Sequence, residues 1–321
     1  MDNVLPTLPA GAGVAAIRLR SLGDTLLMTP GLHALKGWRP DLRLAAVVEP
    51  GFAALLEGNP DFEAVIQAPA GAAGRWRTAR ALRAFAPELA LGLHGGSTAG
   101  WLARASGARE RATFLGLRNA WAYNRLTPPK PPAPGRAALH TVEHVASLLE
   151  ALGMPEPAGG LGPLRLFPSP EARRRMRARL AERGIGGGFA YLSPEAREPG
   201  MRWPAERFAA LAERLKAEHG LASVTASAGA GVALEGVERL AQTTVEELAA
   251  LIAEAALVVA NDGGPVHIAA ALRVPVVAIY SSTVLEIWSP WQARARCLQR
   301  AKLDELDLNT ALAAAAEVLE S

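Results

Sequence analysis

The chain has 321 residues, of which 50% are hydrophobic and 20% charged, with a formal net charge of +3 at pH 7. This composition is typical of a globular protein, and the length favours two domains over one. The small net charge argues against a dedicated nucleic-acid-binding protein, so we expect no nucleic-acid partner.

A single cysteine, Cys297, excludes an internal disulfide framework and a cysteine-based metal site. Residues 1–13 lack the basic start and apolar core of a signal peptide. No stretch approaches the ~20 apolar residues of a membrane span. We therefore expect a cytoplasmic protein.

In the first half of the chain, short apolar strands alternate with helical segments. An apolar strand over residues 14–19 is followed by Gly23 and Asp24 and then by a helix over residues 25–35. Gly23 and Asp24 are therefore expected in a turn at the carboxyl edge of a sheet. Further strands are expected over residues 42–48, 64–66 and 89–93, and further helices over residues 52–56, 76–85 and 140–152. A second glycine turn, residues 94–97, follows the last of these strands.

Glycine and proline mark the loops and the domain boundary. The proline-rich residues 123–136 are expected to form an irregular exposed loop. The Gly- and Pro-rich stretch 153–170 predicts the linker, and we place an N-terminal domain at residues 1–160 and a C-terminal domain at 161–321. An additional prediction is that the last helix, residues 309–319, packs back on the N-terminal domain.

The second half restarts the same alternation. Strands are expected over residues 188–192, 221–225, 257–261 and 274–280, and helices over residues 171–183, 205–218 and 245–253. Alternating strands and helices at this spacing predict an α/β fold with doubly wound parallel sheets. Three tryptophans are expected in the core: Trp38, Trp76 and Trp101.

The most informative stretch is the turn after the apolar run at residues 257–261. Asp262 is followed by Gly263 and Gly264, and Pro265 then opens a small-residue helix. The glycines allow backbone N–H groups to approach a ligand, and the helix N-terminus favours an anion. The simpler interpretation is that Asp262 caps the helix and the glycines only make the turn.

Five segments, in order along almost the whole chain, resemble the ADP-heptose:lipopolysaccharide heptosyltransferase family. They are IRLRSLGD at 17–24 with Thr29-Pro30, EGNPD at 57–61, RWPAERF at 202–208, NDGGPVH at 261–267 and WSPW at 288–291. The resemblance implies the GT-B fold, with two Rossmann-like domains facing across a cleft. It also implies inverting, metal-independent transfer of a heptose-like sugar from an ADP-sugar to a saccharide or lipid-linked acceptor. No cofactor is expected, because the ADP-sugar is a substrate.

The resemblance makes Asp24 the general base that takes a proton from the acceptor hydroxyl. The alternative is that Asp24 only caps the helix after Gly23. The residues that the resemblance places on the acceptor side are Ser21, Gly23, His94 and Gly95.

The donor site implied by the resemblance lies in the second half. Asp262, Gly263 and Gly264 are expected at the sugar and pyrophosphate, Thr243 at the adenine, and Ser193 on the donor side at a strand end. His267, one helical turn further on, is expected either to reach the pyrophosphate or to be satisfied by packing.

Three departures from the family pattern affect this donor site. Met201 stands where members carry a lysine before Arg-Trp-Pro, and Arg197 and Arg202 are the candidate replacements. Residues 226–236 are shorter than the family's helical segment that carries a ribose-binding glutamate. Val284 replaces an acid that often follows the last strand.

Two other functional classes stay open on the sequence. A GT-B sugar-nucleotide epimerase shares the architecture, and a non-catalytic saccharide- or nucleotide-binding relative would explain the altered donor segment. For the transferase, we expect a nucleotide-sugar donor and no metal site. We also expect a cytoplasmic location that includes the surface of the inner membrane, where a lipid-linked acceptor would lie.

Overall fold

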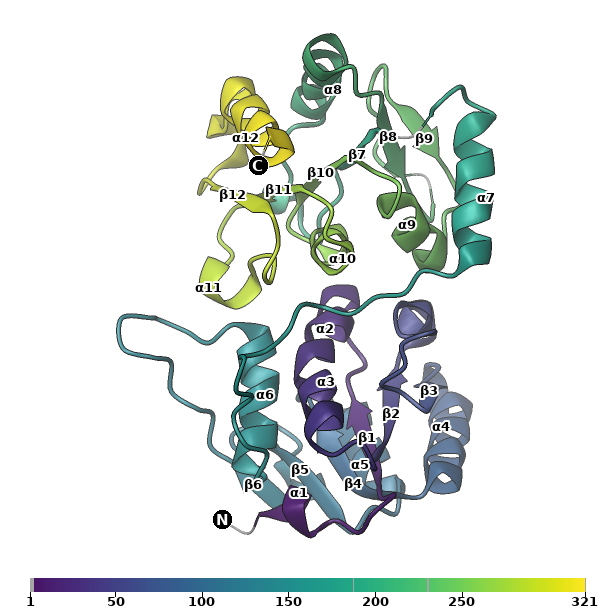
Figure 1. Ribbon diagram of the computed structural model, residues 1–321, viewed down its shortest axis with the longest axis vertical. Coiled ribbons are helices and arrows are strands. Elements are labelled where there is room, and N and C mark those ends of the chain that lie inside the picture. Colours follow the sequence, from purple (N-terminus) through teal and green to yellow (C-terminus); the bar gives the residue numbers. More distant parts are fainter. Residues whose placement is uncertain (1–2, 187, 230, 321) are drawn as a thin grey trace. The chain divides into compact units, whose positions relative to one another are not determined.

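The computed structural model describes residues 3–186, 188–229 and 231–320. It divides into two compact units, residues 1–167 and 168–321. The division falls seven residues after the expected boundary at residue 160 and within the predicted linker stretch. Each unit is a three-layer arrangement of helices around one parallel sheet (Figure 1).

Unit 1 contains a six-stranded parallel sheet in the order β3-β2-β1-β4-β5-β6. Its strands are β1 (Gly13–Ile17), β2 (Arg43–Val48), β3 (Ala64–Gln67), β4 (Pro87–Gly92), β5 (Glu110–Phe114) and β6 (Arg125–Thr127). The order reverses between β1 and β4, which is the arrangement of a Rossmann sheet.

Alternate residues of β1 enter two separate cores, because successive side chains in a strand point to opposite faces. Val14 and Ala16 pack with α1 (Val4–Thr7), α3 (Thr29–Trp38) and α6 (Thr141–Ala151). Ala15 and Ile17 pack with α4 (Gly71–Phe85) and α5 (Ser97–Ala105). The remaining short helices of unit 1 are α2 (Leu22–Leu27), η1 (Pro50–Leu55) and η2 (Ala120–Ala122).

Unit 2 repeats the Rossmann order with a second six-stranded parallel sheet, β12-β11-β10-β7-β8-β9. Its strands are β7 (Ala190–Ser193), β8 (Ser223–Ala226), β9 (Glu238–Leu240), β10 (Leu257–Asn261), β11 (Val276–Tyr280) and β12 (Ala295–Gln299). Its helices are α7 (Pro170–Ala181), η3 (Pro199–Met201), α8 (Ala205–His219), α9 (Val245–Ile252), α10 (Gly264–Leu272), α11 (Leu285–Trp288), η4 (Leu303–Glu305) and α12 (Leu308–Glu320). The order here reverses between β7 and β10.

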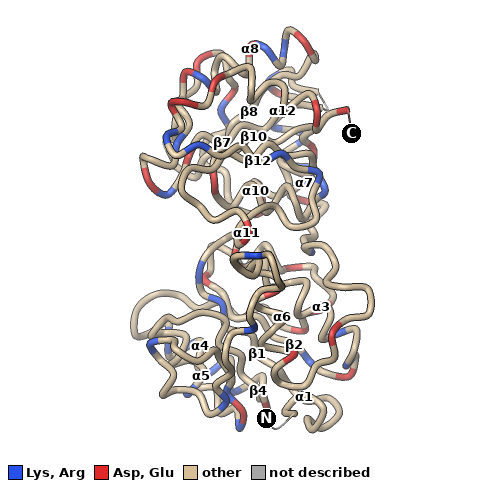
Figure 2. The backbone as a smooth tube through the Cα atoms, turned by 90° about the vertical axis from the view of Figure 1, so that its left-hand side faces the viewer, with Lys and Arg blue, Asp and Glu red and all other residues tan. Residues whose placement is uncertain are grey.

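The helices of unit 2 cover both faces of its sheet. α8 and α12 share one core with β7, β10 and β11, and α9 and α10 lie on the other face. The last helix, α12, is thus packed on the sheet of its own unit. The central strands β7, β10 and β11 carry no charged residue, whereas the helices α7 and α8 carry many (Figure 2).

Several sequence expectations need correction. The helix expected over residues 25–35 is two helices, α2 and α3, separated at Met28. Pro30, at the start of α3, has no N–H to continue the ladder. The loop expected over residues 123–136 contains the strand β6. Trp76 is 61% exposed and is not a core residue.

The sequence contains no stretch that we expect to span a membrane, and the helices of the structure bear on this point. Among the residues that the structure describes, no helix is long and apolar enough to cross a bilayer.

Candidate functional site

In unit 1 the candidate residues gather where the strand order reverses. The segments that follow β1 and β4 leave the same edge of the sheet, and β1 and β4 are neighbours in it. Ligands of open α/β sheets bind at such a switch point, outside the carboxyl ends of the strands. The structure therefore brings Asp24, after β1, to the same place as His94 and Gly95, after β4.

Asp24 lies in the first turn of α2, not in a turn before the helix as expected. Ser21 is the N-cap, and its backbone N–H and hydroxyl donate to Asp24 Oδ2 at 3.0 and 3.1 Å. This is the reciprocal half of a capping box, in which the third helical residue reaches back to the N-cap. Asp24 therefore stabilises the N-terminus of α2, as the capping alternative expected. Gly23, the residue before it, is buried.

The second carboxylate oxygen of Asp24 pairs with Arg18. Arg18 Nη2 donates to Asp24 Oδ1, Nη1 donates to the Leu93 carbonyl, and Nε donates to the Arg20 carbonyl at 3.1 Å. The side chains of Arg18 and Asp24 are only 9% and 14% exposed. A guanidinium held at three points fixes the carboxylate in one orientation. Arg18 lies in the IRLRSLGD segment at residues 17–24, but the sequence alone did not indicate a role for it.

Two histidines lie close to this ion pair. Burial and the positive charge of Arg18 lower the pKa of His94, and the same two causes lower the pKa of His144 on α6. His144 also stacks on Phe114, with ring centroids 3.9 Å apart. Nδ1 of His94 is buried and has no hydrogen-bond partner in the described part of the chain. Both rings are therefore favoured as neutral groups that can donate or accept one hydrogen bond.

The turn after β4 is held by the segment that follows β5. Asn119 donates from Nδ2 to the Gly95 carbonyl at 3.0 Å, and a Cβ on Gly95 would lie 3.2 Å from Leu117. At Gly92, the end of β4, a Cβ would lie 2.2 Å from the hydroxyl oxygen of Tyr123. Glycine at position 92 is therefore required by close packing of Tyr123 and not by a turn.

In unit 2 the buried Asn261 ties three segments together at the second switch point. Its Oδ1 accepts from the Trp203 N–H at 3.0 Å, and its Nδ2 donates to the Pro194 carbonyl at 2.8 Å. Asn261 ends β10 and Pro194 follows β7, the neighbouring strand. The RWP and NDGG segments, far apart in sequence, therefore meet at one edge of the sheet. Ser193, the last residue of β7, is buried at this edge.

Asp262 does not cap the helix that follows it. The N-cap of α10 is Gly263, and this helix end has no side-chain cap. Asp262 instead accepts a hydrogen bond from the Thr283 hydroxyl. Burial raises the pKa of Asp262, and the Thr283 hydrogen bond and the Arg197 charge oppose that rise. The capping interpretation of Asp262 is therefore wrong.

Gly263 is not required by the fold. Its φ of 172° is extended backbone, and a Cβ built on it would meet its nearest neighbours only at 3.7 Å. Substitution would cause neither strain nor a clash, so the turn itself does not explain this glycine. Gly263 lies at the N-terminus of α10, where the first N–H groups have no intrahelical acceptor.

The other donor-side candidates differ in exposure. The Arg197 side chain is 82% exposed, and Arg202 is exposed and donates weakly to the Ala196 carbonyl at 3.3 Å. Thr243 is buried, and its hydroxyl donates to the Leu240 carbonyl at 2.8 Å. His267 is buried within α10. Met201, in place of the family lysine, is half-buried at the end of η3.

The segment between β8 and β9 forms a loop, with no helix among its described residues. Ala230 lies outside those residues. Glu195 Oε1 accepts from the Val232 N–H at 3.0 Å and so fixes the loop to the segment after β7. Glu195 is a functional candidate that the sequence did not suggest, since three elements, η3, α8 and β8, separate it from this loop.

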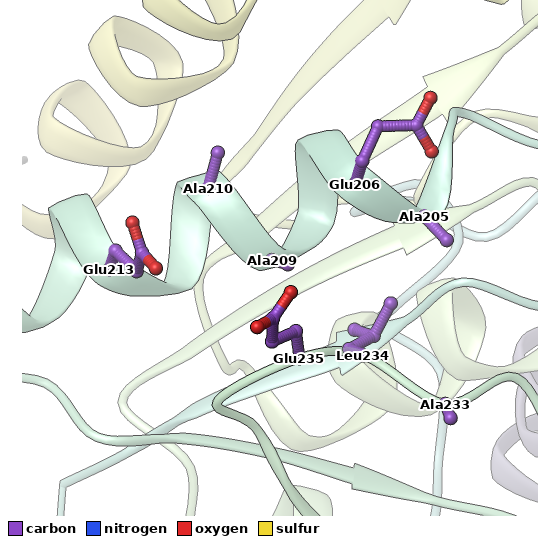
Figure 3. A pocket seen from close by; sticks show the side chains of 8 residues that line it. All are labelled: Ala205, Glu206, Ala209, Ala210, Glu213, Ala233, Leu234 and Glu235. Carbon is purple, nitrogen blue, oxygen red and sulfur yellow. The ribbon is translucent and has the colours of Figure 1, made fainter.

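A hollow of about 340 Å³ lies between α8 and residues 233–235 (Figure 3). Its rim carries three carboxylates: Glu206, Glu213 and Glu235. Negative charge at all three positions opposes a diphosphate, so this hollow is not a suitable site for the nucleotide. Glu235, the glutamate within the shortened segment 226–236, lines it.

Two further histidines, His33 and His140, have structural partners. His33 Nδ1 lies 3.0 Å from Asp61, which also pairs with Arg165, and His140 caps α6 by accepting from the Val142 N–H. Within the described ranges, no group of three or more His, Cys, Asp or Glu side chains is arranged to hold a metal ion.

Comparison with known proteins identifies the family. The model of glycosyltransferase family 9 (heptosyltransferase) matches residues 75–311. The chain belongs to this family. Family 9 proteins are glycosyltransferases, so the chain is an enzyme of the transferase class, and the epimerase alternative is set aside. The matched residues begin after Asp24, so the assignment of the base rests on the geometry of unit 1 and the resemblance of its N-terminal segment.

Individual relatives agree with this family. Lipopolysaccharide heptosyltransferase 3 of Escherichia coli K12 is 26% identical over 294 residues, which cover 85% of this chain and 83% of the relative. A family 9 glycosyltransferase from Veillonella parvula superposes with a TM-score of 0.84, at 21% identity, over 97% of this chain and 98% of the other. The E. coli ADP-heptose lipopolysaccharide heptosyltransferase II gives a TM-score of 0.78, at 20% identity, over 96% and 98%. These likenesses confirm the predicted α/β class and the GT-B fold.

Proposed function

We propose that this family 9 protein is an inverting, metal-independent heptosyltransferase. It moves a heptose-like sugar from an ADP-sugar to a saccharide or lipid-linked acceptor. The observation that carries the proposal is the N-terminus of α10, which has no side-chain cap, at the switch point of a family 9 sheet. ADP-heptose is the donor named for the E. coli relative.

The diphosphate would bind at the N-terminus of α10. Backbone N–H groups of Gly263 and Gly264 and the positive end of the helix dipole stabilise negative charge there, as a metal ion does in other transferases. Arg197, whose charge already acts on Asp262, is exposed and lies 3.6 Å from Glu198, and its side chain would turn from this surface contact toward a phosphate. Arg202 would add a second positive charge at the same edge.

The nucleoside and the sugar would use the neighbouring residues. Asp262, with its raised pKa, would hydrogen-bond the donor sugar, and Ser193 would line the donor at the end of β7. The buried Thr243 would shape the adenine site through its backbone, since its hydroxyl is already bound to Leu240. His267, buried in α10, would support the turn from below.

The chemistry on the acceptor would need Asp24. Its carboxylate takes the proton of the acceptor hydroxyl as that oxygen forms a bond to the anomeric carbon. The bond from that carbon to the diphosphate oxygen breaks on the opposite face, and ADP leaves with the electron pair. The configuration at the anomeric carbon is thereby inverted. Ser21, His94 and Gly95 surround the base and would contact the acceptor.

Nucleotide binding tests this proposal directly. The melting temperature and calorimetric binding are measured with ADP, ADP-heptose, UDP and UDP-N-acetylglucosamine. We expect ADP and ADP-heptose to bind and raise the melting temperature, and NMR of the product to show an inverted anomeric centre. A response to the UDP compounds alone would contradict the proposal in favour of an epimerase. No response to any nucleotide would indicate the non-catalytic relative that Met201 and the loop after β8 suggest.

A further inference from the structure

The helices α4 and α5 of unit 1 carry positive charge without compensation. Together they contain five arginines and no aspartate or glutamate, whereas the net charge of the whole chain is only +3. The five residues are Arg75, Arg77, Arg80, Arg83 and Arg104, and all are exposed. Within the described part of the chain none of them is paired with a carboxylate. In Figure 2 the charged positions along α4 are therefore all blue.

Exposed tryptophans lie among these arginines. Trp76, between Arg75 and Arg77, is 61% exposed, and its ring meets that of Trp101 on α5 edge-on, with centroids 5.3 Å apart. η2 packs against α5 and carries Trp121, which is 69% exposed. An indole ring has a large apolar surface and one N–H donor, which suits the boundary between water and lipid.

The position of these helices is also informative. α4 follows β3 and α5 follows β4, so both begin at the carboxyl edge of the parallel sheet. Asp24 and His94 lie at that same edge. Trp76 and Trp101, each in the second turn of its helix, are thus in the half of unit 1 that contains the proposed acceptor residues.

We propose that α4 and α5 form a docking surface for an anionic lipid bilayer, with Trp76 among the headgroups and the arginines on lipid phosphates. Charge complementarity selects this occupant, because five exposed guanidinium groups without a carboxylate partner favour a surface of anionic headgroups. The inference rests on the proposed function in one respect only, that the acceptor is lipid-linked. The α4–α5 surface would then hold the enzyme at the membrane that contains this acceptor.

Vesicle flotation tests the surface with the full chain. Phosphatidylcholine vesicles are compared with vesicles that also contain phosphatidylglycerol. We expect binding only to the anionic vesicles and loss of binding at high salt. The variant Arg75→Gln/Arg77→Gln/Arg80→Gln should bind roughly 100-fold more weakly, since each arginine near an anionic surface contributes about a fivefold factor. Trp76→Ser should also weaken binding, by roughly tenfold.

A matched control removes three exposed arginines from unit 2: Arg174→Gln/Arg177→Gln/Arg214→Gln. It should bind vesicles like the unchanged protein. Equal binding to neutral vesicles, or equal loss in the control and the α4 variant, would overturn the proposal. Binding to a single-stranded oligonucleotide but not to vesicles would overturn it in favour of a nucleic-acid partner. Transfer to a delipidated, water-soluble acceptor should be unchanged in the α4 variant, so a failed docking surface remains distinguishable from a failed transferase.

Discussion

At the scale of single residues, Asp24 combines a structural and a proposed chemical role. An ionised carboxylate offers about four lone-pair sites. Three contacts already use them: the Ser21 N–H, the Ser21 hydroxyl and the Arg18 guanidinium. One site remains for an acceptor hydroxyl, and its direction is set by the other three contacts. The sequence indicated both roles of Asp24 but not Arg18, because an arginine that ends a strand usually extends to solvent.

Replacing Arg18 tests its role in positioning Asp24. Arg18→Gln should lower kcat by roughly 100-fold, because a base displaced by about 1 Å loses that much rate. ADP affinity should stay unchanged, since Arg18 belongs to unit 1. Arg18→Lys keeps the charge but loses the fork, so we expect partial recovery of kcat. Steady-state kinetics and calorimetry check both variants, and a loss of ADP binding equal to the loss of rate would contradict the positioning role.

At the scale of elements, the sequence predicted most central strands and most long helices. β1, β2, β4, β7, β10 and β11 are apolar runs, which are easily found because they are buried on both faces. The strands β5, β6, β9 and β12 were missed, since each carries charged residues, three of them are sheet edges and β5 is next to an edge. The turn before α10 was placed correctly, but the alternative that Asp262 caps this helix was wrong, since the N-cap is Gly263.

Gly263 allows a test in which stability and binding separate. Gly263→Ala should leave the melting temperature unchanged, because the backbone is extended and a Cβ would meet its nearest neighbours at 3.7 Å, which is an ordinary van der Waals contact. ADP should bind roughly 10–100-fold more weakly, since the methyl group blocks a charge-assisted contact worth about 1.5–3 kcal/mol. Gly37→Ala, with no neighbour within 4 Å, is the control. Unchanged ADP affinity in Gly263→Ala would mean that the diphosphate binds elsewhere.

A substitution at Met201 should strengthen ADP binding, whereas Gly263→Ala should weaken it. Met201→Lys restores a positive charge where other family members are expected to carry one. We expect ADP to bind roughly tenfold more tightly, in line with a charge-assisted hydrogen bond to phosphate. Met201→Leu, which keeps the size without the charge, should bind ADP as the unchanged protein does. Calorimetry that showed no gain with lysine would indicate that Arg197 or Arg202 already fills this position.

At the scale of the whole molecule, two units share one strand order without an internal repeat in the sequence. Each sheet is fixed by buried apolar strands and glycine turns, which many unrelated sequences can supply, so the shared order is visible only in the structure. The expected boundary was seven residues early because Gly and Pro continue from residue 153 to residue 170. The proposed base lies in one unit and the proposed diphosphate site in the other.

Metal removal tests the leaving-group chemistry of the complete enzyme. If backbone N–H groups of α10 and arginine side chains stabilise the departing ADP, EDTA should leave the transfer rate unchanged. Added Mg²⁺ should raise that rate by less than about twofold, since the charge is already compensated. Coupled measurement of ADP release checks this. A strict requirement for Mg²⁺ or Mn²⁺ would contradict the metal-independent mechanism.

The transfer rate of Asp24→Asn is the most direct measurement of the central claim. ADP-heptose and a saccharide acceptor are supplied at saturation, and product formation is followed for the unchanged protein, Asp24→Asn and the control Ser21→Ala. Ser21→Ala removes one hydrogen bond to the Asp24 carboxylate but keeps the base. Its melting temperature therefore shows how much stability is lost when the cap of α2 is weakened. We predict that Asp24→Asn lowers the rate roughly 10²–10⁴-fold while ADP affinity is retained, because only the proton acceptor is lost. A rate for Asp24→Asn close to that of the unchanged protein would contradict the mechanism, since Asp24 would then support only the helix.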